Sequence, residues 1–411
     1  MYTFVERKKI KNQILRERLA NIGPILKEEG VDAWLVLARE YNEDIVFPFL
    51  TTADYPTARR ITMFLIAHED GVTKPYSISL PDIELDKIYT RDFDYRTEDQ
   101  FDALNKLVKK LNLKKIAINY SENFAFADGL SAGLYRMLLE KLPKEVTDNF
   151  VSADPIAVRV LEIRTDTELE IYPHVMSVAM SVIDEAFSDA VVTPGKTTLR
   201  DVMDFMDTKV NSLGISCWFP SHVNLQRKGG AMLEEDTVIE KGDLLRTDFG
   251  ITYCGLNTDT QRLCYVLRDD EEELPEGLKV AMKNNNRFQD IVRETMEVGK
   301  TGNEVFLESI AKGKAEGLRP ILYTHSLGCH GHAAGPMFGL YTKQEPIPVK
   351  GDLKLHDKTS FALELTTMEY VPEFESDLHI QTEESIVFVG GEAKFLAPNR
   401  DVIKVIHGGK N

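Results

Sequence analysis

The chain has 411 residues, more than one ordinary hydrophobic core accommodates, which predicts two domains. Its 43% hydrophobic and 28% charged residues are typical of a globular protein, and its formal net charge of −17 argues against nucleic acid or an anionic membrane as a partner. It has no apolar run long enough for a membrane helix, no signal-peptide pattern and only four scattered cysteines, so we expect a cytoplasmic protein.

The first part of the chain alternates helical and strand patterns. It starts with a charged amphipathic helix, and the segments that follow are a helix in RLANIGPILKEEG, strands in VDAWLVLA and RRITMFLIAH, a helix in DQFDALNKLVKKL and a strand in KKIAINY. This order is typical of an α/β layer domain. The pattern ends around ADPIAVRVLEIR, so we place one domain at residues 1–155 and a second at 156–411.

The second domain contains a candidate internal sequence repeat. The triplet GKT begins at Gly195 and again at Gly299, and each copy precedes a helical pattern that closes at a glycine, Gly214 or Gly317. The repeat is too long for a solenoid unit. It predicts a domain of two similar halves, each with a helix pair and a strand pair, although GKT is also a common turn before a helix.

Two aspartates lie on a predicted β-hairpin, RTDFGITYCGLNTDTQR, at residues 246–262. If this hairpin folds symmetrically about Tyr253 and Cys254, Asp248 lies directly opposite Asp259. Like charges in that position destabilise a strand pair, unless the two carboxyl groups share a proton or hold a cation between them.

More ionisable residues follow on later segments of the second domain. His325 begins the glycine-rich stretch HSLGCHGHAAGP, and Glu364 and Glu383 lie on strands predicted at residues 360–370 and 378–389. If the four carboxylates of the domain converge, they repel each other unless cations neutralise them, and two divalent ions balance four negative charges. A neutral imidazole adds a further ligand. The residues therefore predict a two-metal site.

The second domain carries a series of motifs in chain order. They are Asp-x-Gly, Tyr-x-Gly and Asp-x-x-Arg (Asp248, Gly250, Tyr253, Gly255, Asp259, Arg262), His-x6-His (His325, His332), and then Glu364 and Glu383. This series resembles that of the pita-bread metallopeptidase superfamily. The length and the α/β N-terminal domain are similar to the branch of Xaa-Pro aminopeptidase, prolidase and creatinase. The resemblance covers essentially the whole chain. It implies a creatinase-like α/β N-terminal domain, an α+β pita-bread C-terminal domain with pseudo-twofold duplicated halves, and a homodimer.

The resemblance also implies five metal ligands. Asp259 and Glu383 match the carboxylates that bridge two divalent ions in the family. Asp248 matches a chelator of one ion. His325 and Glu364 match ligands of the other ion. The oxygen-rich site favours Mn²⁺, and Fe²⁺, Co²⁺ and Zn²⁺ are alternatives.

The activity implied is metal-dependent cleavage of small Xaa-Pro peptides, by an aminopeptidase or a dipeptidase. A hydroxide bridging two divalent ions attacks the scissile amide in this chemistry. Glu364 is placed to shuttle the proton to the departing nitrogen, and His332 matches the histidine that steadies the substrate.

Several positions near the substrate depart from the family pattern. The histidine expected upstream of the first aspartate falls near Ala231, where there is none, and His222 can serve only if the chain has an insertion. Gln381 stands where the family usually has an arginine. His379 and Gln381 share a strand face with Glu383, so we expect both to line the substrate site, although His379 can equally be an ordinary strand residue.

These departures leave other functions open. One is an amidohydrolase similar to creatinase or an ectoine-type hydrolase, which acts on a small amide or amidine. Another is a catalytically inactive member of the same fold used for binding. Retention of all five ligands argues for the metallopeptidase.

Overall fold

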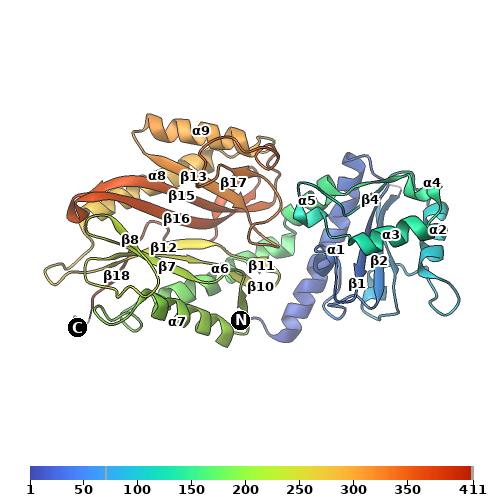
Figure 1. Ribbon diagram of the computed structural model, residues 1–411, viewed down its shortest axis with the longest axis horizontal. Coiled ribbons are helices and arrows are strands. Elements are labelled where there is room, and N and C mark those ends of the chain that lie inside the picture. Colours follow the sequence, from blue (N-terminus) through green and yellow to red (C-terminus); the bar gives the residue numbers. More distant parts are fainter. Residues whose placement is uncertain (70–71, 409–411) are drawn as a thin grey trace. The chain divides into compact units, whose positions relative to one another are not determined.

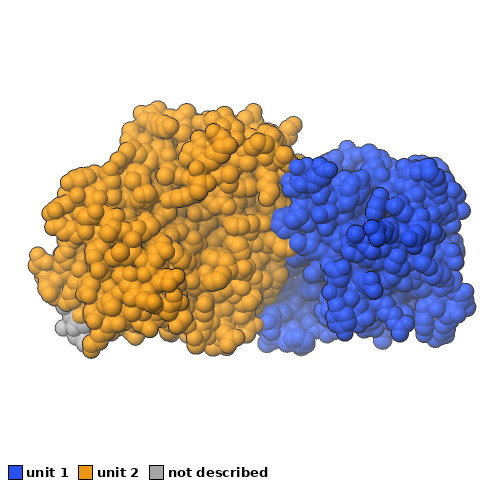
Figure 2. All heavy atoms as spheres, in the orientation of Figure 1, with its two compact units in different colours: residues 1–167 blue, residues 168–411 orange. Residues whose placement is uncertain are grey.

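The computed structural model describes residues 1–69 and 72–408, and the chain divides into two compact units, residues 1–167 and 168–411 (Figure 2). The division lies beyond residue 155 because helix α5 (Asp154–Glu162) packs against helix α1 (Phe4–Glu28) of the first unit. No helix within the described residues is both long and apolar enough to span a membrane.

The first unit is an α/β layer domain, as predicted. Its five-stranded sheet has the order β3-β2-β1-β4-β5; β1, β4 and β5 are parallel, and β2 and β3 are antiparallel to their neighbours. Its other elements are β1 (Ala33–Arg39), β2 (Ile61–Glu69), β3 (Val72–Ile78), α2 (Gln100–Lys110), β4 (Ile116–Ile118), α3 (Ala132–Lys141), α4 (Lys144–Thr147), β5 (Phe150–Ser152) and 3₁₀ turns at Phe47–Phe49, Leu85–Lys87 and Ala125–Ala127.

The second unit is built on a ten-stranded sheet with helices packed against it (Figure 1). The main strand order is β14-β13-β15-β16-β12-β9-β7-β8, so the two halves of the unit meet where β12 pairs with β16. The elements are α6 (Asp166–Ala186), α7 (Leu199–Ser212), β6 (Ser216–Cys217), β7 (His222–Arg227), β8 (Ala231–Leu233), β9 (Leu244–Phe249), β10 (Ile251–Tyr253), β11 (Leu256–Asn257), β12 (Thr260–Val266), α8 (Glu276–Thr295), α9 (Gly302–Ala315), β13 (Pro320–Ser326), β14 (Met337–Phe338), β15 (Thr359–Val371), β16 (Ser376–Val389), β17 (Glu392–Phe395), β18 (Lys404–Ile406) and a 3₁₀ turn at Pro372–Phe374.

The two halves repeat the same local structure at the start of α7 and α9. Each helix begins after a threonine, Thr198 or Thr301, whose hydroxyl accepts from the backbone N–H three residues on in a capping box. The two helices start 103 residues apart, whereas the GKT triplets are 104 apart, so the third residue of the first triplet is not the cap. Gly214 and Gly317 follow the helix ends with positive φ, as the sequence predicted.

Helix α8 positions strand β16 from the face opposite the site. Gln289 Nε2 donates a hydrogen bond of 2.7 Å to Thr382 Oγ1 on β16. Because side chains alternate along a strand, Thr382 facing α8 leaves Gln381 and Glu383 on the opposite face of the sheet. Both Gln289 and Thr382 are buried, so this contact is shielded from water.

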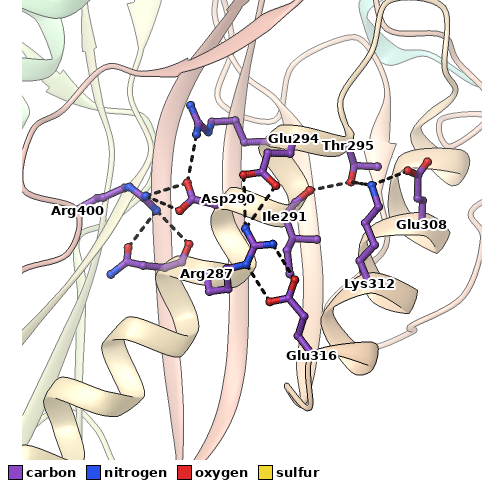
Figure 3. Close-up of polar contacts among 11 residues, drawn as sticks. Arg287, Asp290, Ile291, Glu294, Thr295, Glu308, Lys312, Glu316 and Arg400 are labelled. Atoms are coloured by element: carbon purple, nitrogen blue, oxygen red, sulfur yellow. Dashed lines mark hydrogen bonds and ion pairs between the residues drawn. The ribbon is translucent and has the colours of Figure 1, made fainter.

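Ion pairs on the exposed side of α8 connect it to its neighbours (Figure 3). Arg287 donates to Glu316, directly after α9, through Nε at 2.9 Å and Nη2 at 2.7 Å. Arg400, in the C-terminal segment, binds Asp290 through Nη2 at 2.9 and 3.0 Å. The Arg287 pair is bidentate and links α8 to the end of α9, and the Arg400 pair links α8 to the C-terminal segment.

Candidate metal centre

Six paired residues form a row across the centre of the large sheet. The strand register places each of them directly opposite the next, from β7 through β9, β12, β16 and β15 to β13. Directly paired residues project from the same face of a sheet, so their side chains gather on one surface. The row reads His222, Asp248, Gln261, Glu383, Glu364 and Tyr323.

The predicted hairpin register is wrong. Asp248 lies opposite Gln261, not opposite Asp259. The chain reverses at Cys254 and Gly255, both with positive φ, so the centre of the hairpin is one residue further along than predicted. The partner of Asp248 is therefore Gln261, two residues after Asp259. Because side chains alternate with a period of two, Asp259 still lies on the same face as Asp248, at the diagonal position.

Three of the predicted ligands, Asp259, His325 and Glu383, form a compact buried group. Their ligand atoms all lie within 4.8 Å of one another, and each residue is at most 3% exposed. His325 Nε2 lies 3.5 Å from Asp259 Oδ2 and 3.7 Å from Glu383 Oε1. Asp259 Oδ1 and Glu383 Oε1 have no hydrogen-bond partner among the described residues. We call this group the three-ligand cluster.

The cluster suits a bound cation because its imidazole offers a free lone pair and its buried carboxylates repel each other. His325 Nδ1 lies 3.0 Å from the Ser326 carbonyl oxygen, which only accepts, so Nδ1 carries the proton and Nε2 keeps a free lone pair toward the carboxylates. Burial lowers the pKa of His325 and favours its neutral form. Burial, with repulsion between the carboxylates, raises the pKa of Asp259 and of Glu383 well above the usual range. Two oxygens and one imidazole nitrogen without protein donors fit a divalent metal ion.

The other two predicted ligands, Asp248 and Glu364, lie in the same row but are bound by the Gln261 amide. Gln261 Nε2 donates to Asp248 Oδ2 at 3.2 Å and to Glu364 Oε1 at 3.0 Å. Burial, and then the charge of Asp248, raise the pKa of Glu364 to about 7. This value suits a group that accepts and returns a proton near neutral pH.

Arg246 brings a positive charge that the sequence analysis missed. It lies on β9 two residues before Asp248 and therefore on the same face. Its Nη2 donates to Asp248 Oδ2 at 2.9 Å and its Nε to Gln261 Oε1 at 2.9 Å. Gln381, where the family usually has an arginine, donates instead to the Tyr341 hydroxyl at 3.3 Å.

The sequence allowed His222 as the upstream histidine only if the chain has an insertion, and the structure places His222 in the row. It lies on β7 directly opposite Asp248. Burial raises the pKa of Asp248, and the charges of Arg246 and then His222 oppose this shift. The β7–β8 hairpin lies in the chain between His222 and β9, and His222 pairs with Asp248 across it. Alternation along HVNLQR is the signal that could have identified the histidine.

His332 packs beside the cluster. Its ring centroid lies 4.6 Å from that of His325 and 5.2 Å from that of Trp218, both edge to face. A Cβ on the preceding Gly331 would lie 2.3 Å from the Trp218 indole, so the loop approaches this ring through a glycine. Burial, then His325, lower the pKa of His332 to about 4. His332 is therefore neutral near pH 7 and both donates and accepts hydrogen bonds.

His379 shares the strand face but shows no link to the carboxylates. Its backbone N–H and carbonyl bind the side chain of Gln226 at 2.9 and 2.8 Å. Its Nδ1 is buried without a hydrogen-bond partner among the described residues, and the charge that acts on it is that of Asp377.

The arginine of the Asp-x-x-Arg motif has a structural contact. Arg262 donates to Glu384, the residue after Glu383, through both terminal guanidinium nitrogens, with Nη2 at 2.9 Å from Oε2. Both side chains are buried, and they join β12 to β16 where Gln261 pairs with Glu383. The ion pair therefore holds together the two halves of the site.

Comparison with known proteins agrees with this geometry. The sequence model of metallopeptidase family M24 matches residues 174–389, which is more than half of the chain. The chain belongs to metallopeptidase family M24. A search of curated proteins gave no match. The M24 match spans the whole row and the three-ligand cluster, so the buried carboxylates belong to a metallopeptidase domain.

Solved structures share the fold of this M24 chain over nearly its full length. X-Pro aminopeptidase from Thermotoga maritima has a TM-score of 0.65 at 17% identity and covers 93% of this chain and 99% of its own. Xaa-Pro dipeptidase from Bacillus anthracis has a TM-score of 0.63 at 18% identity, with 96% and 99% covered. A variant of Escherichia coli aminopeptidase P has a TM-score of 0.61 at 15% identity, with 96% of both chains covered.

Proposed function

We propose that this protein is a metal-dependent peptidase that cleaves small peptides at Xaa-Pro bonds. The observation that carries the proposal is the buried three-ligand cluster, with unpartnered carboxylate oxygens, in a chain of metallopeptidase family M24. The solved structures with the same fold include an X-Pro aminopeptidase and an Xaa-Pro dipeptidase, which supports the choice of peptide.

The proposed ligands are the five that the family resemblance implies, for two divalent ions, preferably Mn²⁺. Their common features support this choice: all lie on one face of the sheet, or at the end of one of its strands, around Gln261. Four carboxylates balance the charge of two divalent ions. The ligands are Asp248, Asp259, His325, Glu364 and Glu383.

Two divalent ions held by these residues would supply a hydroxide nucleophile near neutral pH and would polarise the scissile carbonyl. Glu364 would accept a proton and return it to the leaving nitrogen, for which a pKa raised to about 7 is well suited. His332 steadies the substrate with its ring N–H. His222, at the end of the row furthest from Tyr323, contacts the substrate. His379 and Gln381 lie on β16, on the same strand face as Glu383, and are further candidates for substrate contact.

The proposal also includes a homodimer in the cytoplasm. The four cysteines form no disulfide in the structure, which is consistent with a reducing compartment; they are Cys217, Cys254, Cys264 and Cys329. Sedimentation of the purified protein would measure the oligomeric state directly.

A peptide panel tests the function. Ala-Pro, Ala-Pro-Ala and the matched Ala-Ala-Ala should be compared with Mn²⁺ and with a chelator. We expect cleavage of proline peptides only, loss of activity with chelator, and a roughly 10²–10⁴-fold lower kcat in Glu364→Gln. Cleavage of the tripeptide indicates an aminopeptidase, and cleavage of the dipeptide alone a dipeptidase. No cleavage of either proline peptide in Mn²⁺ would contradict the proposal, and turnover of creatine instead would favour the amidohydrolase.

A further inference from the structure

Arg246 and Gln381 lie at the same level of the large sheet, on either side of strand β12. Asp248 on β9 and Glu383 on β16 both pair directly with Gln261 on β12. Both pairings are antiparallel, so β9 and β16 run in the same direction. Arg246 and Gln381 each stand two residues before these partners. They therefore occupy equivalent places beside the row, on the same face of the sheet.

The side chain at position 381 has no link to the carboxylates of the site. Gln381 is 7% exposed, and its Nε2 donates to the Tyr341 hydroxyl at 3.3 Å. Its Oε1 is buried without a hydrogen-bond partner among the described residues. A neutral amide with one unsatisfied end therefore stands where the family usually has an arginine.

Arg246 brings a positive charge to the same level from β9. Its Nη2 donates to Asp248 Oδ2 at 2.9 Å, and its Nε donates to Gln261 Oε1 at 2.9 Å. Gln261 Nε2 donates to the same Asp248 oxygen at 3.2 Å, so the three side chains form a closed triangle of hydrogen bonds. The Arg246 side chain is 9% exposed, and in this buried setting water competes little for these contacts.

The triangle fixes the orientation of the Asp248 carboxylate. Its Oδ2 accepts both hydrogen bonds, whereas its Oδ1 accepts none from the described residues. Rotation of the carboxylate would break the bond from the arginine, which is of the strong, charge-assisted kind. Because an arginine only donates, Arg246 also determines that Gln261 turns its oxygen toward the guanidinium and its nitrogen toward Asp248.

We propose that Arg246 takes the place, from a different strand, of the arginine that the family usually has at position 381, and that it is a positioning residue for Asp248. The inference rests on the proposed metal-dependent peptidase and concerns how one of its ligands is held. A role in charge compensation alone predicts the opposite effect on metal binding, because removal of a cation beside the site would then strengthen the binding of Mn²⁺.

Titration of the metal-free protein with Mn²⁺ by calorimetry tests the inference without measuring activity. Arg246→Met removes the charge and the donors, and it should weaken Mn²⁺ binding by about 10–100-fold, the range found for groups that orient metal ligands. Arg246→Lys keeps the charge but lacks the planar fork, so it should also weaken binding, by about tenfold. It provides a second test if Arg246→Met does not fold.

Moving the arginine between strands is the sharper test. The double variant Arg246→Met with Gln381→Arg returns the charge to β16 at the same level, and it should recover most of the lost Mn²⁺ affinity. Gln381→Arg alone should not strengthen binding, because Arg246 already holds Asp248.

Arg400→Met is the matched control. Arg400 binds both oxygens of Asp290 on α8 at 2.9 and 3.0 Å, on the face of the sheet opposite the site. Its loss should leave the Mn²⁺ affinity unchanged. The melting temperature of every variant shows whether it is folded.

Mn²⁺ binding by both Arg246 variants that is stronger than in the wild type, or within about threefold of it, would overturn the inference and leave the proposed peptidase intact. A folded double variant that binds Mn²⁺ no better than Arg246→Met would do the same. Failure of the wild type to bind any Mn²⁺, Fe²⁺, Co²⁺ or Zn²⁺ would instead overturn the proposed function, and the inference with it.

Discussion

Replacing each of two histidines by alanine separates the predicted substrate contact from the one that the structure favours. His222 and His379 are both half-buried and both lie on strands of the large sheet. His222 is directly opposite Asp248, and residues in that relation have Cβ atoms about 5 Å apart. Among the described residues, His379 shows no contact with the carboxylates of the proposed metal site. The charge that acts on its ring is that of Asp377. We therefore expect His222, and not His379, to touch the substrate.

The magnitude follows from the interaction lost. A hydrogen bond from His222 to a substrate oxygen that gains negative charge in the transition state contributes about 1.5–3 kcal/mol. Since each 1.4 kcal/mol is a factor of ten, His222→Ala should lower kcat/KM by roughly 10–150-fold. His379→Ala should change it by less than about threefold, which corresponds to roughly 0.7 kcal/mol.

The assay is steady-state hydrolysis of the best proline peptide, with Mn²⁺ at saturation and the melting temperature of each variant recorded as a control for folding. His222→Gln keeps a donor and should recover part of the loss. If His222→Ala stays within threefold of the wild type while His379→Ala falls more than tenfold, the assignment of the substrate contact to His222 is refuted.

Three further predictions concern the cluster and its support. Asp259→Ala should abolish turnover and lower bound Mn²⁺ measured by elemental analysis, because it removes a cluster ligand; wild-type turnover would exclude Asp259 as a ligand. Arg262→Met should destabilise the fold by about 3–5 kcal/mol in urea unfolding, because it leaves Glu384 buried and unpaired, and adding Glu384→Leu should restore most of it; no loss in the single variant would show that the pair is unimportant. The metal-free protein should lose stability as pH rises from about 4.5 to 7, because Glu364, with its pKa raised to about 7, binds a proton in the native state that the unfolded chain has released. Added Mn²⁺ should raise the melting temperature more at pH 7 than at pH 5, since it binds deprotonated ligands, and a Glu364→Gln variant with an unchanged pH dependence would contradict this cause.

Much of the fold and the class of site could be predicted from residue types and their spacing. The alternation that places Phe361, Leu363 and Leu365 in the core leaves Glu364 on the other face, and this is a local property of one strand. The aspartates, the histidine and the glutamates likewise stand in local motifs, and a divalent ion needs those residue types whatever surrounds them. Local patterns therefore identified the chemistry.

The arrangement around those residues depended on the tertiary structure. Whether Asp259 or Gln261 lies opposite Asp248 depends on the backbone at Cys254 and Gly255, which shifts the register without changing the face. His222 reaches Asp248 only because β7 pairs with β9 across the β7–β8 hairpin.

The contacts of Gln261 extend even further along the chain. It meets Glu364 and Glu383 only because β12 pairs with β16, more than a hundred residues later. Arg246 carries no motif of its own, and its role appears only once Gln261 and Asp248 lie beside it. Pairings between distant strands are set by the packing of the whole domain, because no short segment of sequence contains both partners.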